Sequence, residues 1–160
     1  MQTEANSGYH NGASAHPIAE LLACPPGVGT VLNGAAECIE FDAGDTLFRQ
    51  FSACQGLYVV ISGQLLRKAE RMEARLTLGT ARPGDLVELA AALGDGWHTC
   101  TMTAQTPGSV LLLPIDALRR AFEAYPPLRM QLLEELAREV SRAYANSCAT
   151  RMGGVRRHAN

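Results

Sequence analysis

The residues of this chain whose types and spacing could do chemistry lie within residues 82–104. This stretch opens with a Pro-Gly-Asp turn and continues as an apolar run with a single acid, Glu88, before a Gly-Asp-Gly turn. His98, Thr99 and Cys100 follow, at the start of a segment that alternates as a half-buried strand does. The first turn of a helix leaves backbone N–H groups unpaired, and such groups bind anions. The stretch therefore predicts a loop that can present N–H groups to an anion, with one carboxylate and one imidazole beside it.

These residues do not form a recognisable catalytic group. No serine or cysteine has an identifiable neighbouring base, no carboxylate pair stands out, and the phosphate-loop pattern Gly-x-x-x-x-Gly-Lys is absent from the sequence. The five cysteines are irregularly spaced, without a Cys-x-x-Cys pair or a zinc-like histidine spacing. We therefore expect no enzyme activity, no metal site, and free thiols of which several are buried; an iron–sulfur or redox sensor is the alternative.

The elements that must position this loop are short strands separated by glycine turns. Segments with strand character are residues 38–42, 46–48, 56–62, 64–68 and 71–80, and a last strand is expected at 110–113. Turns every dozen or so residues predict an antiparallel roll or barrel.

Helices are expected on both sides of these strands. A short helix is predicted at residues 17–23, a second short turn at 28–36, and one helix from residue 115 to about 125. A longer helix is predicted from Leu128 to Ala145, where Leu128 and Leu132 can pack on the roll. Its apolar residues at heptad-like spacing are Leu133, Leu136, Val140 and Ala143. This pattern predicts a homodimer through residues 128–144, and plain core packing is the alternative.

Composition limits the function classes. Apolar residues make up 47% and charged residues 19% of the 160 residues, as in a soluble single domain. A formal net charge of −2 gives no basic excess for nucleic acid. No apolar run approaches the ~20 residues that span a bilayer, and the N-terminus lacks an apolar signal core. We expect a cytoplasmic protein with a flexible arm at 1–16, a folded domain at 17–146 and a flexible basic tail at 147–160.

Four motifs in this order resemble the cyclic-nucleotide-binding domain of the catabolite-activator (Crp/Fnr) superfamily. Residues 41–48 are similar to the first turn of its roll, 56–63 to its central strand and turn, and 82–89 to the entry of its phosphate-binding cassette; the two C-terminal helices are similar to its B and C helices. The resemblance implies a mainly β fold with flanking helices, a jelly-roll-like antiparallel β-roll closed by a short and a long C-terminal helix.

The resemblance also implies a ligand, cyclic AMP or cyclic GMP. Its cassette uses a glycine that lets the backbone approach the phosphate, a glutamate for the ribose 2′-hydroxyl and an arginine for the phosphate. Glu88 matches the glutamate, Leu89 the residue after it, and Thr99 the residue after the arginine. Val87 stands at the glycine position and His98 at the arginine position, so the backbone is covered and the bidentate cation is lost. Tight cyclic AMP binding is therefore not expected.

The residues predicted to contact an effector are Val87, Glu88, Leu89, His98, Thr99, Cys100 and Tyr144. Each main candidate has a structural alternative. Glu88 can be satisfied by the cassette's own N–H groups. His98 can be a half-exposed loop histidine beside Trp97, and Tyr144 can face solvent instead of reaching over the pocket.

Only 16 residues follow Tyr144, too few for the three-helix DNA-binding module that such regulators have after the long helix. The predicted function is a stand-alone regulatory module that binds a small effector, with a nucleotide as one candidate, in a degenerate pocket and shifts the long helix. The alternative is a ligand-free dimerisation or protein-interaction scaffold. An open polar cavity near Glu88 and His98 would favour the regulatory module. A cavity filled by the side chains of Val87, Leu89 and Met102 would favour the ligand-free scaffold. A redox sensor at Cys100 requires an accessible thiol of lowered pKa.

Overall fold

A computed structural model describes residues 16–155, and its centre is a roll of two antiparallel sheets. The strands are β1 (Glu37–Phe41), β2 (Thr46–Phe48), β3 (Gly56–Ser62), β4 (Leu65–Arg71), β5 (Ala74–Ala81), β6 (Leu86–Val87), β7 (Thr101–Ala104) and β8 (Gly108–Pro114). One sheet has the order β1-β8-β3-β6 and the other β2-β7-β4-β5. The predicted antiparallel β-roll is confirmed. The predicted N-terminal arm lies outside the described residues except for its last residue, His16, which begins a helix.

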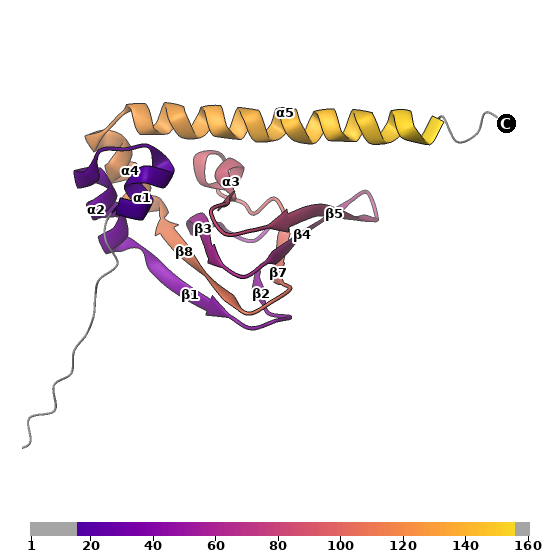
Figure 1. The fold of residues 1–160 in the computed structure, drawn as a ribbon, viewed down its shortest axis with the longest axis horizontal. Coiled ribbons are helices and arrows are strands. Elements are labelled where there is room, and N and C mark those ends of the chain that lie inside the picture. The colour runs from indigo at the N-terminus through magenta and orange to yellow at the C-terminus, as the bar shows by residue number, and fades with distance from the viewer. Residues whose placement is uncertain (1–15, 156–160) are drawn as a thin grey trace, which may run out of the picture.

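Helices cover one end and one side of the roll (Figure 1). They are α1 (His16–Leu22), α2 (Pro26–Ala35), α3 (Leu89–Leu93), α4 (Ile115–Ala124) and α5 (Pro127–Val155). The first two and α4 cluster at one end, while α5 runs along the roll past α3 (Figure 1). The predicted end of the long helix at Ala145 is wrong. The helix continues to Val155 because residues 146–152 contain no glycine or proline to end it. Among the described helices, none has the length and hydropathy of a membrane span.

The central strand β3 is buried on both faces. Leu57 and Val59 pack against the helices, while Tyr58 and Val60 point into the roll. Side chains alternate along a strand, so both sets of neighbours must be apolar. This explains the unbroken apolar run that the sequence shows here.

A Pro-Gly-Asp turn joins β5 to β6 and sets where the loop that follows begins. The backbone N–H of Arg82 donates to the carboxylate of Asp85 (2.9 Å), and Gly84 takes a φ of 91°. Gly84 N–H donates to the carbonyl of Val60 (2.8 Å), and Val60 N–H donates to that of Asp85 (3.0 Å). The turn is thereby held against β3, so the residues after it enter the roll at a defined point.

The long helix α5 is anchored only over its N-terminal part. Leu128 and Leu132 are buried in the core beneath it, and Leu136 packs against the same cluster. The side-chain amide nitrogen of Gln131, oriented toward α1, donates to the carbonyls of Leu22 and Ala23, each at 3.2 Å. From residue 137 to 146 every side chain except one is exposed. Over residues 137–146, α5 therefore lies beside the roll with few buried side chains.

Candidate functional site

The carboxylate of Glu88 is the centre of the loop at residues 82–104, which we call the cassette. Glu88 precedes α3 with a left-handed backbone (φ 72°), and its side chain is buried. Its oxygens meet His98 Nδ1 (3.1 Å), Thr99 N–H (3.0 Å), Thr99 Oγ1 (2.9 Å) and the Cys100 thiol (3.3 Å). Every partner comes from the far end of the cassette. The carboxylate therefore joins the two ends of this loop; it is satisfied within the cassette, as the alternative predicted, but by one backbone N–H and three side chains instead of backbone N–H groups alone.

His98 is held inside the roll. Its ring stacks on Phe48 with centroids 3.8 Å apart and planes 6° apart, and only 2% of the residue is exposed. Its backbone N–H donates to Ser52 and its carbonyl accepts from Phe51, both at 2.9 Å. The expectation of a half-exposed histidine is wrong. Trp97 beside it is 54% exposed, so it is this neighbour that faces outward.

The thiol of Cys100 is buried and hydrogen-bonded to Glu88. Burial, together with the negative charge of Glu88, raises the pKa of this thiol to about 12. A redox sensor needs an exposed thiol of lowered pKa. The hypothesis of a redox sensor at Cys100 is therefore wrong.

The side chains around Glu88 are closely packed, and Glu88 itself is only 7% exposed. Val87, Leu89 and Met102 are almost fully buried, as the ligand-free alternative requires. The structure brings six predicted site residues together: Val87, Glu88, Leu89, His98, Thr99 and Cys100. Tyr144 lies apart from them on α5 and is 73% exposed.

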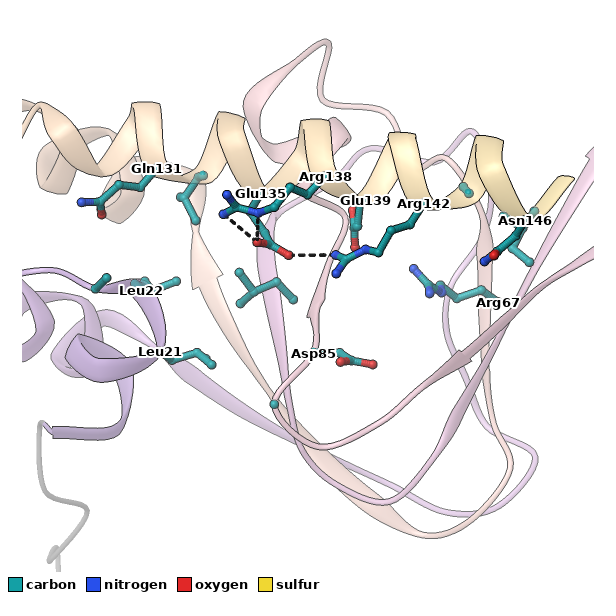
Figure 2. Close-up of a pocket in the computed structure, with 16 residues that line it drawn as sticks. Leu21, Leu22, Arg67, Asp85, Gln131, Glu135, Arg138, Glu139, Arg142 and Asn146 are labelled. Atoms are coloured by element: carbon teal, nitrogen blue, oxygen red, sulfur yellow. Dashed lines mark hydrogen bonds and ion pairs between the residues drawn. The ribbon is translucent and has the colours of Figure 1, made fainter. Parts of the chain in front are cut away.

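An open pocket of about 630 Å³ lies next to the cassette, between α5, the end of α1 and the outer part of the roll. We call it the α5 pocket, and Figure 2 shows it. Its charged lining residues are Arg67, Asp85, Glu135, Arg138, Glu139 and Arg142. Asp85 and Leu86, at the entry of the cassette, line it immediately before the buried Val87, so the α5 pocket opens at this end of the cassette.

Arg67 is the residue of this pocket that sequence reasoning missed. It lies two residues after Leu65, which points into the roll, so the alternation of β4 turns Arg67 toward the same side. Its neighbours in register are Met102 on β7 and Gly79 on β5, and the glycine has no side chain to fill the space. Its Nε is buried without a hydrogen-bond partner among the described residues. A cation on the inward-facing side of a strand was the signal available in the sequence.

Two other groups of the α5 pocket differ in their pairing. Glu135 accepts from Arg138 (3.0 Å) and from Arg142 (3.2 Å), so two guanidinium groups share one carboxylate. Glu139 forms no ion pair with the described residues. Burial raises the pKa of Glu139, and the positive charge of Arg67 opposes that rise. Arg67, Glu139 and Asp85 are thus charged lining residues that form no ion pair with the described residues.

Comparison with known proteins identifies the fold. Residues 38–125 match the cyclic nucleotide-binding domain family. The catabolite activator protein of Thermus thermophilus superposes with a TM-score of 0.69 at 20% identity, over 79% of this chain and 60% of that one. The sensor domain of the transcriptional regulator DNR from Pseudomonas aeruginosa gives a TM-score of 0.67 at 21% identity, over 82% and 88%.

One curated relative is an enzyme. The lysophospholipase NTE1 of Eremothecium gossypii is 29% identical over 107 residues, which are 66% of this chain. The matched region spans only 7% of that enzyme's length. The similarity therefore concerns one small part of that enzyme.

Replacing Glu88 by alanine should lower the free energy of unfolding by about 3 kcal/mol, because it leaves buried donors of the cassette without an acceptor. Chemical denaturation at neutral pH measures this. Glu134→Ala, an exposed acid on α5, is the control and should change the value by less than about 0.5 kcal/mol. A Glu88→Ala protein as stable as the wild type would contradict the structural role of this carboxylate.

The thiols should differ in their reactivity with a disulfide reagent at pH 8. With a pKa of about 12, roughly one Cys100 in ten thousand is a thiolate at that pH. We expect exposed Cys38 and half-exposed Cys148 to react in the native protein, and Cys100 only after denaturation. The double variant Cys38→Ser/Cys148→Ser should then show no rapid phase. If the folded double variant rapidly released one equivalent of the reagent's thiol leaving group per chain, one of its buried cysteines would be reactive, which contradicts this prediction.

Proposed function

The chain belongs to the cyclic nucleotide-binding domain family, and from this premise we propose that it is a non-catalytic regulatory module with its effector site in the α5 pocket. The proposal rests on one contrast. The carboxylate of Glu88 already occupies the donors of the cassette, whereas the adjoining α5 pocket is open and holds unpaired polar groups. A small effector bound there touches both α5 and the roll.

The cassette is a poor site for a phosphate in this chain. A phosphate would need the N–H and O–H donors of Thr99 that Glu88 now uses. It would also place a second anion beside a buried carboxylate, which costs free energy in a low dielectric. The side chain of Val87 covers the backbone of the cassette. His98 already stacks on Phe48 and forms a hydrogen bond with Glu88. These contacts make the cassette a structural element.

The anchoring of α5 gives the effector a way to act. The helix is buried through Leu128 and Leu132, but beyond Leu136 its described side chains are mostly exposed. A ligand that contacts the roll and this loosely held part stabilises one position of the helix over others. Only such differential contact can shift a conformational equilibrium.

A second candidate function is a dimerising scaffold that needs no ligand, and the exposed face of α5 favours it. The apolar residues on this face are Met130, Leu133, Ala137, Val140 and Tyr144. They step by three and four residues, as in a coiled-coil seam. Of the four residues predicted for the seam, Leu133 and Val140 lie on this face, whereas Leu136 packs on the core and Ala143 lines the α5 pocket. A dimer through this face is compatible with an effector on the opposite face of the same helix.

Filling the α5 pocket should abolish ligand-induced stabilisation. Ala143→Phe places a ring in the pocket, whereas Ala145→Phe, on an exposed position that does not line it, is the matched control. The measurement is thermal unfolding with cyclic AMP, cyclic GMP, cyclic di-GMP, nucleosides and the common amino acids. A ligand at 100 times its dissociation constant stabilises by about 2.7 kcal/mol, or several degrees. We expect any shift to persist in Ala145→Phe and vanish in Ala143→Phe; a shift that survives Ala143→Phe contradicts the proposed site.

An acid on the exposed seam should break the dimer. Val140 is 61% exposed within one chain, so Val140→Asp leaves the fold intact and places charges face to face across a seam. Light scattering after size-exclusion chromatography should give twice the chain mass for the wild type and for the control Ala145→Asp, and the single-chain mass for Val140→Asp. A wild-type protein of single-chain mass at micromolar concentration argues against the scaffold candidate.

A further inference from the structure

Building on the proposed effector site, we infer that the α5 pocket binds a free α-amino acid with an apolar side chain, held as a zwitterion between Arg67 and the carboxylates of Glu139 and Asp85.

Arg67 supplies the anchor for the ligand's carboxylate. A guanidinium pairs with a carboxylate through two parallel N–H···O bonds, the strongest geometry available to either group. The guanidinium of Arg67 enters the pocket from β4, facing Gly79 in register, and its Nε is buried without a partner among the described residues. A ligand carboxylate would offer acceptors to a donor-rich side chain that lines the pocket.

Glu139 and Asp85 supply acceptors for the ligand's ammonium group. Figure 2 shows Glu139 directed into the pocket from α5 and Asp85 directed into it from the turn before β6, with Arg67 entering between these two elements. Glu139 is half-buried, and the turn uses only one oxygen of Asp85. An ammonium donates three hydrogens and is attracted to both carboxylates.

The charge balance of the pocket favours a zwitterion over a phosphate. Three cations, Arg67, Arg138 and Arg142, face three carboxylates, those of Asp85, Glu135 and Glu139, so the lining is neutral overall. Glu135 already neutralises part of the arginine charge on α5. A phosphate dianion would add negative charge beside Asp85 and Glu139, whereas an amino acid adds none and offers one charge of each sign.

The remaining lining determines the side chain. Five leucines border the pocket: Leu21, Leu22, Leu78, Leu86 and Leu132. The volume of about 630 Å³ lies within the range of small-molecule sites and leaves room beside the polar groups. An aliphatic or aromatic side chain would remove exposed leucine surface from water, which is favourable. Leucine, methionine and phenylalanine are therefore the first ligands to test.

Isothermal titration of the full chain with these amino acids tests the inference, together with two analogues of leucine that each lack one charge. N-acetyl-leucine has no ammonium group, and isoamylamine has no carboxylate. We expect leucine or a similar amino acid to bind, and both analogues to bind at least tenfold more weakly. Equal binding of either analogue overturns the inference.

Two variants and their matched controls test the residues. Arg67→Met and Glu139→Gln should each weaken amino-acid binding at least tenfold. Arg75→Met, an exposed arginine of the same hairpin, and Glu134→Gln, an exposed acid of the same helix, should bind as the wild type does. Circular dichroism shows whether the Arg67→Met protein is folded. If that variant is unfolded, the affinity of Glu139→Gln for the amino acid alone tests the inference. Wild-type affinity in a folded Arg67→Met or in Glu139→Gln overturns the inference.

The outcomes separate this inference from the proposed site. A nucleotide or nucleoside that binds the wild type but not Ala143→Phe, while no amino acid binds, overturns the amino-acid inference and leaves the α5 pocket as the effector site. A ligand that binds Ala143→Phe as tightly as the wild type contradicts the site itself. Absence of binding by every compound contradicts both and leaves the dimerising scaffold.

Discussion

The hydrogen bonds to the carboxylate of Glu88 are the interaction on which the rest of this structure depends. Through them one side chain joins the start of α3 to the start of β7, two points ten or more residues apart. They compensate for burying a carboxylate and for the left-handed backbone of Glu88 itself. With this loop closed, His98 can stack on Phe48 among the buried apolar side chains of the roll. The N–H and O–H donors of Thr99 are thus used by the chain's own carboxylate.

Local sequence patterns predicted the fold well because the fold depends on local signals. Alternation located the strands, glycine turns their ends, and the change to helical spacing after residue 114 located α4 and α5. The residues of the cassette were also correctly placed together. What the patterns could not show is their environment. His98 is buried because Phe48, fifty positions earlier, stacks on it, and no local pattern contains that contact. The same holds for Arg67, whose position depends on how β4, β5 and β7 pair.

The two faces of α5 explain why its role was harder to predict than its existence. Apolar residues occur on the face of α5 toward the core and on its face toward solvent. The heptad pattern read from the sequence therefore combined residues of both faces into one predicted seam. The structure separates Leu132 and Leu136, which pack on the core, from Val140 and Tyr144, which are exposed. It also places Glu139 on the inner side, where a charge is hydrated poorly. Burial, which separates these roles, is a property of the folded chain.

The uneven anchoring of α5 makes it a lever. Its fulcrum is the cluster around Leu128 and Leu132, and Val155 lies 19 residues beyond Leu136. At 1.5 Å per residue this arm is about 28 Å long. A tilt of about 10° at the fulcrum would therefore displace the far end by about 5 Å, roughly one helical turn. The same tilt would move Glu139, three residues beyond Leu136, by only about 0.8 Å, so a partner packed on the far end of this helix would be displaced several times farther than this pocket residue.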